Sequence, residues 1–383
     1  MEKVKMKTTY IKRKHNVITQ EKTLESLHTF KNFPIYIGCT DKDQSTDIVA
    51  DLSIAICKKT GIMQLDKVLP LEVIYGDYHS EALGSLWTEH HALFVDFLNS
   101  YKPTNVLEIG GSNGFIAKEA VKKNKKINKW VMVEPAPAYK GNKKIQIIAE
   151  SFDENFKYTG SIDCVVHSHT FEHIYEPGLF MKQLGAFMKK GDTQIFSVPN
   201  LYKYLSNKQA NWINFEHNVF LSEHYVDYLL LINGFEILEK KYFYEHSIFY
   251  ATKKVREVNA ALPIDNKYKV NKKLFETYLT FYEAKIDEIN KKITDQSTEV
   301  YLFGAHIFSQ FLMLMGLKGN IVGVLDNSTL KEGKRLYGTN VTVFNPKSIR
   351  NKKNITVVLR AGSYQKEIKD QLLIINPSVK ILE

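Results

Sequence analysis

Short apolar runs alternate along the central part of the chain with segments in which apolar residues recur every three or four positions. The short runs are typical of buried strands, and the wider spacing is typical of amphipathic helices. We predict strands at residues 106–109, 130–133, 145–149, 164–166 and 193–198, and helices at 85–99, 114–123, 178–189 and 222–233. Two further strands at 235–244 and 248–252 follow one another directly. This alternation predicts a mainly parallel sheet covered by helices on both faces, with an antiparallel pair at one edge.

The two ends of the chain have different patterns. Residues 1–85 contain short segments with strand character, at 34–38, 52–57 and 68–75. Residues 270–293 predict one long helix with an apolar stripe that we expect to pack between domains, made of Leu279, Tyr282, Ile286, Ile289 and Ile293. A second α/β pattern then predicts strands at 300–304, 321–325, 355–359 and 374–375 and a helix at 308–316. We therefore expect a small N-terminal domain (1–85), a central α/β domain (86–260), and a linker helix with a C-terminal α/β domain (261–383).

The 383 residues include 52 Lys and Arg against 42 Asp and Glu, a net charge of +10, and 44% are hydrophobic. This apolar fraction supplies a folded core and excludes a disordered chain. The basic residues are dispersed, so the charge suits an acidic small molecule at least as well as nucleic acid, and we expect no nucleic-acid partner. Three scattered cysteines and the lack of a long apolar segment predict a cytoplasmic protein without disulfides or a membrane partner. We expect this protein to be a monomer or a homodimer.

The segment VLEIGGSNGF places a cluster of glycines directly after a predicted strand. Gly110, Gly111 and Gly114, with Ser112 between them, let the backbone approach a ligand closely at the turn into the next helix. The spacing differs from the G-x-G-x-x-G of dinucleotide sites. Glu108, two residues before the first glycine, would repel a pyrophosphate and would instead attract a cation, such as the amino acid part of S-adenosylmethionine.

Later strand ends add candidates for the nucleotide part of this ligand. Glu134 ends the next strand, where a carboxylate accepts hydrogen bonds from the ribose hydroxyls in nucleotide-binding α/β folds. Ser151 and Phe152 follow the third strand, where an adenine ring would rest against an apolar edge. Asp163 precedes the fourth strand. These positions predict one continuous cofactor edge along the sheet.

Histidines are the candidates for acid–base chemistry. His167, His169 and His173 follow the fourth strand in VVHSHTFEHIYEP, and we assign His167 to the cofactor. No nearby carboxylate or cysteine completes an evident metal site around them, so we expect no metal. Glu216 and His217 lie in the loop after the fifth strand, and imidazole has the near-neutral pKa of a general base. Taken alone, such a pair is more often a surface feature than a catalytic one.

Two family resemblances sharpen these expectations. The ordered set E-x-G-G-x-x-G, a following acid and I-D-C-V-V resembles the class I S-adenosylmethionine-dependent methyltransferases, which implies a Rossmann-like central domain that binds this cofactor. Nearly the whole chain is also similar to the sugar C-methyltransferases of deoxysugar biosynthesis. That similarity rests on the segments ICKKTGIMQLDKVLPLEVIYGDYHS, VLEIGGSNGF, INFEHNVFLS and VYLFGAHIFSQFLMLMGLKGNIVGVLDNSTLKEGKRLYGTNVTVFNP. It implies an N-terminal zinc-binding domain, a central methyltransferase domain and a C-terminal Rossmann-like α/β domain.

The second resemblance assigns catalytic roles to three residues. Glu216 and His217 match the Glu-His pair of the family, whose histidine is the proposed general base. Tyr78 in YGDYHS matches a tyrosine of the N-terminal domain that reaches the same cleft. The family tyrosine shortly before Glu-His is replaced here by Asn214 or Phe215, which implies different substrate contacts.

The zinc-binding motif of the family is degenerate in this chain. The first C-x-x-C pair stands as R-K-H-N at residues 13–16, and the second keeps only Cys57, with Thr60 at the partner position. One thiolate, even with His15 or Cys39, does not complete a tetrahedral site. We therefore expect no structural zinc and an N-terminal domain held by packing alone.

The resemblances predict an S-adenosylmethionine-dependent methyltransferase that acts on a nucleotide-linked sugar. In the family reaction a base removes the proton beside a ketone, and the enolate takes the methyl group. O- or N-methylation of a saccharide or its precursor is the alternative, and a non-catalytic binding protein is a further one. Gly304 and Asp326 would also allow a dinucleotide site of the dehydrogenase type, but the second and third glycines of that motif are missing.

Overall fold

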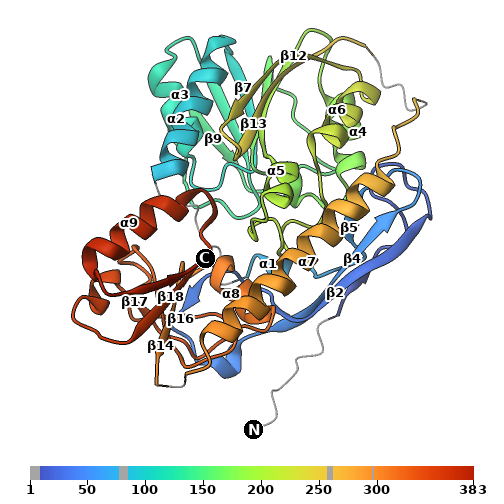
Figure 1. Cartoon of the computed structure of the whole chain (residues 1–383). Helices are drawn as coiled ribbons and strands as arrows, with labels where there is room; N and C mark the ends of the chain where they lie inside the picture. The colour runs from blue at the N-terminus through green and yellow to red at the C-terminus, as the bar shows by residue number, and fades with distance from the viewer. Residues whose placement is uncertain (1–8, 77–84, 257–261, 296) are drawn as a thin grey trace.

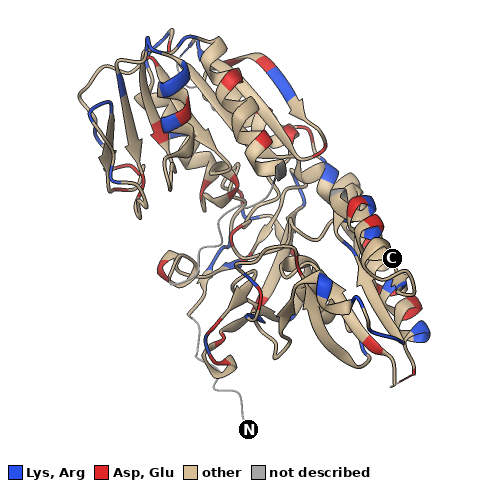
Figure 2. Ribbon diagram, turned by 90° about the vertical axis from the view of Figure 1, so that its left-hand side faces the viewer, with Lys and Arg blue, Asp and Glu red and all other residues tan. Residues whose placement is uncertain are grey.

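The computed structural model describes residues 9–76, 85–256, 262–295 and 297–383. Three larger sheets organise these residues: a seven-stranded central sheet, a three-stranded N-terminal sheet and a five-stranded C-terminal sheet. The long helix α7 (Tyr268–Lys292) crosses in front of the N-terminal sheet and reaches toward the C-terminal one (Figure 1). Figure 2 shows basic and acidic residues interspersed over all three parts, as the dispersed charges of the sequence imply.

The central sheet has the strand order β12-β13-β11-β10-β7-β8-β9. Strands β7 to β11 are parallel, whereas β13 is antiparallel to both β11 and β12, which confirms the predicted sheet and its antiparallel edge. The bounds are β7 Asn105–Ile109, β8 Lys129–Val133, β9 Ile145–Ile148, β10 Cys164–Ser168, β11 Thr193–Pro199, β12 Phe235–Phe243 and β13 Ser247–Lys254. The strand order reverses beside β7, and folds of this kind bind ligands at the carboxyl ends of the strands at that point.

Helices cover both faces of the central sheet, as predicted. On one face lie α2 (Ser85–Ser100) and α3 (Phe115–Lys123), and on the other lie α4 (Pro177–Phe187) and α6 (Glu223–Ile232) (Figure 1). Burial on both sides explains the continuous apolar runs of these strands. The short helix α5 (Leu201–Ser206) occupies a stretch that we predicted as loop. Among the described residues, no helix combines the length and apolarity that a membrane crossing requires.

The N-terminal sheet is antiparallel in the order β2-β4-β5. Its strands are β2 (Leu24–Pro34), β4 (Val49–Cys57) and β5 (Met63–Leu65), and β1 (Ile11–Lys12) pairs separately with β6 (Lys67–Val68). The strand predicted at 52–57 is confirmed, but the strands predicted at 34–38 and 68–75 are wrong. Residues 35–38 form a turn after β2, and Pro70 precedes a short helix, α1 (Leu71–Ile74).

Irregular pairing explains why strand β2 escaped prediction. The register of β2 against β4 shifts between Ser26 and His28 and again between Phe30 and Phe33. Each irregularity turns the following side chain to the other face, so that apolar and polar residues no longer alternate along the sequence.

The C-terminal sheet is parallel throughout, in the order β17-β15-β14-β18-β19. Its elements are β14 (Glu299–Phe303), α8 (Ile307–Leu314), β15 (Ile321–Leu325), β17 (Val343–Phe344), β18 (Ile355–Leu359), α9 (Gln365–Ile375) and β19 (Lys380–Leu382). The predicted strands at 300–304, 321–325 and 355–359 are confirmed, as is the helix at 308–316. The strand predicted at 374–375 is wrong because these residues end α9, and Ile374 is 83% exposed.

The stripe of α7 packs between the N-terminal and C-terminal sheets, as predicted. Tyr282, Ile286, Ile289 and Ile293 are buried in one apolar cluster with residues of β4, β14 and α8, and Leu279 packs against it partly buried. The strands β3 (Cys39–Thr40) and β16 (Arg335–Leu336) add a direct antiparallel pairing between the same two parts. Arg335 reinforces this pairing, since both terminal nitrogens donate to the carboxylate of Asp47, at 2.6 and 2.7 Å.

Three of the four positions of the degenerate zinc motif form a hydrogen-bonded cluster. The buried Asn16 side-chain amide donates to the Cys57 Sγ at 3.3 Å and to the Thr60 Oγ1 at 3.1 Å. Thr23 Oγ1 also lies 3.0 Å from the Cys57 Sγ. Arg13, the fourth position, turns away and donates to the Asn218 Oδ1 at 2.7 Å. Hydrogen bonds therefore connect the two loops that a metal would otherwise join.

We predict that Asn16→Ala lowers the free energy of unfolding by about 1–3 kcal/mol, because it removes a buried amide that donates to both Cys57 and Thr60. The matched control Asn155→Ala, at an exposed position, should change it by less than ~0.5 kcal/mol. Denaturant titration measures both values.

A chelator should leave the thermal midpoint of the wild-type protein unchanged, and a midpoint that falls on chelation would mean that a structural metal is present.

Candidate functional site

The glycine loop lies at the carboxyl end of β7, at the reversal point of the sheet. Gly110 and Gly114 have φ angles of 76° and 69°, in the left-handed region that favours glycine. A Cβ on Gly110 would lie 2.6 Å from the Thr170 Oγ1, and one on Gly114 would lie 2.6 Å from the Tyr139 ring. The loop is therefore packed against the segment after β10 on one side and against the segment after β8 on the other.

Glu108 is buried beneath this loop. Its carboxylate accepts a hydrogen bond from the Trp130 Nε1 at 2.8 Å, and a Cβ on Gly111 would lie 2.9 Å from the Glu108 Cδ. Burial raises the pKa of Glu108 to about 7, although the Trp130 hydrogen bond acts in the opposite direction. A cation bound over the loop would favour the ionised carboxylate, so the position suits the positively charged ligand expected from the sequence.

Glu134 connects the glycine loop after β7 with the segment after β8. Its carboxylate accepts hydrogen bonds from the Ser112 backbone N–H at 3.1 Å and from the Ala136 backbone N–H at 3.0 Å. The side chain is half-buried, so part of it stays open to a ligand. Ser151 is exposed, and Phe152 packs edge-on against neighbouring phenylalanines of the α4 region. Glu134 and the loop thus adjoin directly, whereas Ser151 and Phe152 form the more distant rim.

Two sequence candidates lie away from this edge. His167 lies within β10, is fully buried and stacks on the Phe196 ring at 4.6 Å, with its Nε2 2.9 Å from the Gln194 amide. Burial lowers the pKa of His167 to about 3, so we correct its assignment from cofactor ligand to neutral core residue. Asp163 lies at the opposite end of β10, where it accepts hydrogen bonds from the Thr104 backbone N–H.

A group of histidines and carboxylates lies at the carboxyl end of β10. The short helix η2 (Phe171–His173) brings in Glu172 and His173, and the loop before α6 brings in Glu216 and His217. One possible ligand atom from each of Glu172, His173 and His217 lies within 4.8 Å of the other two. The structure therefore brings the predicted base His217 and its competitor His173 into one site, and it adds Glu172.

Glu172 is the functional candidate that the sequence reasoning missed. It is 0% exposed, and among the described residues neither carboxylate oxygen has a hydrogen-bond partner. The His169 Nδ1 lies 3.1 Å from its Oε1, without the direction of a hydrogen bond. Burial raises the pKa of Glu172. The expectation that no nearby carboxylate accompanies the histidines is wrong, because Glu172 lies directly before His173. Its burial, which the sequence does not show, is what makes it a candidate ligand.

Burial also sets the electrostatics of His217. It lowers the pKa of His217, while the Glu172 carboxylate acts to raise it. The His217 backbone N–H donates to the Asn214 Oδ1 at 2.7 Å, and Phe215 is buried against the Phe33 ring of β2. Asn214 and Phe215, which replace the family tyrosine, thus hold the loop in place.

Among the described residues, Tyr75 brings a hydroxyl group to this site. The predicted Tyr78 lies outside the described residues. Tyr75 follows α1 instead, and its hydroxyl lies 3.1 Å from the His173 Nδ1, while the Glu216 Oε2 lies 3.6 Å from the same nitrogen. The N-terminal part of the chain therefore reaches the histidine group, as the family resemblance implies.

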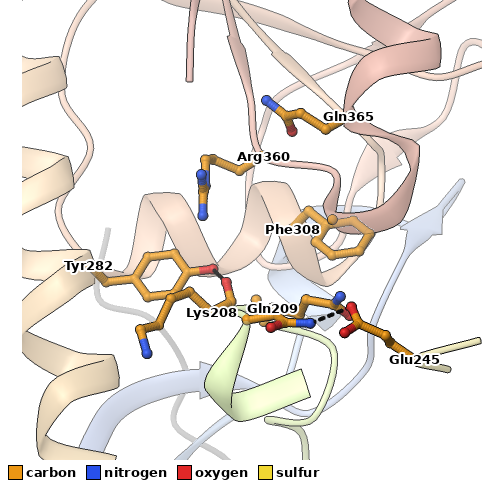
Figure 3. Close-up of a pocket in the computed structure, with 10 residues that line it drawn as sticks. Lys208, Gln209, Glu245, Tyr282, Phe308, Arg360 and Gln365 are labelled. Atoms are coloured by element: carbon orange, nitrogen blue, oxygen red, sulfur yellow. Dashed lines mark hydrogen bonds between the residues drawn. The ribbon is translucent and has the colours of Figure 1, made fainter. Parts of the chain in front are cut away.

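A cavity of about 270 Å³ lies between α5, α7 and the C-terminal sheet. Figure 3 shows Arg360, Tyr282 and Phe308 around it, with Lys208 and Gln209 from the end of α5. The Arg360 Nε is buried without a hydrogen-bond partner among the described residues. Two cationic side chains beside aromatic rings suit an anionic group attached to a planar one.

The glycine turn after β14 is held by hydrogen bonds within the C-terminal part of the chain. The Asp326 carboxylate accepts hydrogen bonds from the Ala305 backbone N–H at 2.8 Å and the Ser328 backbone N–H at 2.9 Å. Lys331 pairs with the same carboxylate at 3.0 Å. Because its oxygens are engaged in this way, Asp326 has the contacts of a structural residue after Gly304 rather than of a free ribose acceptor.

Comparison with known proteins identifies the central part of the chain. Residues 85–240 match the family model described as a methyltransferase domain. The N-methyltransferase NodS from Bradyrhizobium japonicum superposes with a TM-score of 0.35 at 12% identity, covering 45% of this chain and 97% of NodS. An S-adenosylmethionine-dependent methyltransferase from Mesorhizobium loti gives a TM-score of 0.37 at 10% identity, covering 44% of this chain and 98% of its own. No curated protein matches the chain.

The matched residues contain the glycine loop, both strand-end acids and the histidine group, on a sheet whose order reverses beside the loop. Residues 85–240 are therefore a methyltransferase domain with the class I, Rossmann-like fold.

Proposed function

We propose that the protein methylates a nucleotide-linked sugar, at a carbon beside a ketone. The observation that carries this proposal is the direct connection between the glycine loop and the histidine group. Thr170 Oγ1 donates to the Ile109 carbonyl at 3.3 Å and fills the space above Gly110, and Glu172 and His173 follow within three residues. A methyl donor bound at the loop would therefore have a base nearby.

For the cofactor, we assign the ribose hydroxyls to Glu134 and the amino acid part to the loop above Glu108. Gly110, Gly111, Ser112 and Gly114 would supply a close backbone surface, and Ser151 and Phe152 the adenine rim. Bound S-adenosylmethionine supplies an electrophilic methyl group beside a positive sulfur.

For the chemistry, we assign the general base to His217. Its burial keeps the imidazole neutral and able to accept the proton from the carbon beside the ketone. The C–H electron pair would then move into the enolate, and bound S-adenosylmethionine would supply the methyl group for the new C–C bond. The Glu172 carboxylate would stabilise the protonated imidazole, and Tyr75 and Glu216 hold the neighbouring His173 in place.

For the substrate, we assign the diphosphate to the cavity beside Arg360 and Lys208. Residues 207–210 line this cavity, and His217 follows seven residues later along the chain. O- or N-methylation would use the same base without a ketone. Mass spectrometry of nucleotide sugars incubated with enzyme and cofactor, followed by NMR of the product, distinguishes methylated carbon from oxygen or nitrogen. The proposal fails if only nucleotide-free acceptors gain a methyl group.

We predict that Glu134→Ala weakens S-adenosylmethionine binding by about 1.5–3 kcal/mol, since it removes a charged hydrogen-bond acceptor. Calorimetric titration measures this loss. Glu154→Ala, at an exposed position of the same domain, serves as the control and should bind S-adenosylmethionine with wild-type affinity. Equal affinity of Glu134→Ala and wild type would refute the ribose assignment.

We predict that His217→Ala lowers turnover by ~10²–10⁴-fold, the usual range for loss of a general base, with cofactor affinity nearly unchanged. His173→Ala tests the competing assignment in parallel, and thermal melts establish that both variants fold. If His217→Ala retains near-wild-type turnover while His173→Ala is inactive, the base is His173 instead.

A further inference from the structure

We propose that Glu172, His173 and His217 form a binding site for a divalent transition-metal ion, and that the ion inhibits methyl transfer by occupying His217. The inhibitory part rests on the proposed role of His217 as base, whereas the binding site itself does not. Two imidazoles and one carboxylate form a mixed nitrogen and oxygen donor set that suits Zn²⁺, Co²⁺ or Fe²⁺ better than Mg²⁺ or Ca²⁺.

Unpaired buried atoms provide the first support. Both oxygens of the fully buried Glu172 and the buried His217 Nδ1 lack hydrogen-bond partners among the described residues. Leaving such groups unpaired costs roughly 1–3 kcal/mol each, and more for a charged one. A cation coordinated by these atoms would satisfy all of them at once.

The orientation of His173 provides the second support. Its Nδ1 lies 3.1 Å from the Tyr75 hydroxyl and 3.6 Å from the Glu216 Oε2, while its Nε2 lies 3.9 Å from the Glu172 Oε1. Metal-bound histidines usually direct one ring nitrogen at the ion and the other at a carboxylate or another oxygen acceptor. His173 has this arrangement, with Glu216 as the outer partner.

The distances require a modest closure. The three candidate ligand atoms lie within 4.8 Å of one another. Metal–donor bonds of ~2.0–2.2 Å in tetrahedral geometry place donors roughly 3.3–3.5 Å apart. Coordination therefore requires side-chain movements that shorten these separations by up to ~1.5 Å, and a tetrahedral ion would keep a fourth position for water.

Occupancy and catalysis exclude one another at His217. The lone pair that binds the ion is the one that would accept the substrate proton, so the metal-bound histidine no longer acts as a base. The expected result is reversible inhibition with one ion per chain.

Titration of the wild-type protein with Co²⁺ alone tests the site without substrate. We expect one Co²⁺ per chain with the intense visible absorption of a four- or five-coordinate ion, displaced by Zn²⁺. Glu172→Gln and His173→Ala should each weaken Co²⁺ binding about tenfold or more. The control His224→Ala, on α6, removes a ring that lies 3.0 Å from the Asp265 backbone carbonyl and should bind like wild type. Absence of the absorption in wild type, or its retention in both site variants while they stay folded, would overturn the site.

Turnover measured against Zn²⁺ tests the inhibitory part. We expect loss of methyl transfer at one equivalent of bound ion and full recovery with a chelator. Activation by Zn²⁺ would overturn inhibition and the assignment of His217 as base, while leaving the binding site intact. Co²⁺ binding by a protein that methylates no nucleotide sugar would refute the proposed function alone.

Discussion

The position of His217 depends on one apolar core that is shared by the N-terminal sheet, helix α7 and the C-terminal sheet. Trp212, five residues before His217, packs edge-on against Phe275 at 6.0 Å and Tyr278 at 5.6 Å, both on α7. Phe215 inserts against Phe33 of β2. The loop that carries His217 is therefore anchored on both sides by rings from other parts of the chain. Buried aromatic side chains contribute much of the packing energy of a core, so the three parts cannot separate without displacing this loop.

Much of the central domain followed from the sequence because its strands are buried on both faces. A strand such as Lys129–Val133 is apolar in all but its first residue, and this pattern does not depend on the neighbouring strands. Strand β2 of the N-terminal sheet is only partly buried and depends on alternation, which its irregular pairing with β4 destroys. Residues 374–375 were misassigned for a similar reason, since two β-branched residues at the end of a helix resemble a short strand.

The residues of the candidate site also differ in how well the sequence predicts them. Glycines with positive φ and acids at strand ends are local features, so Glu108, Glu134 and the loop were predictable from spacing. Burial is a property of the whole fold, and it separates residues that look alike in sequence. His167 and His169 are two positions apart, yet the first stacks in the core and the second reaches the Glu172 carboxylate. His167 lies within β10, whereas His169 follows the end of that strand with a φ of 49°, which turns its side chain out of the alternation of the strand.

Two buried carboxylates at the same sheet edge show how the site is prepared for positive charge. Glu108 has one compensating donor, the Trp130 indole, and burial still raises its pKa to about 7. Glu172 has histidines around it instead of fixed donors, and the pKa of Glu172 is raised as well. Neither group reaches its lowest energy as an ion until a cation approaches, because burial penalises the isolated charge. The carboxylate under the loop therefore favours a cationic ligand, and the carboxylate among the histidines favours either a protonated imidazole or a metal ion. Competition between a proton and a metal ion for the His217 nitrogen beside this carboxylate is the physical basis of the inhibition proposed above.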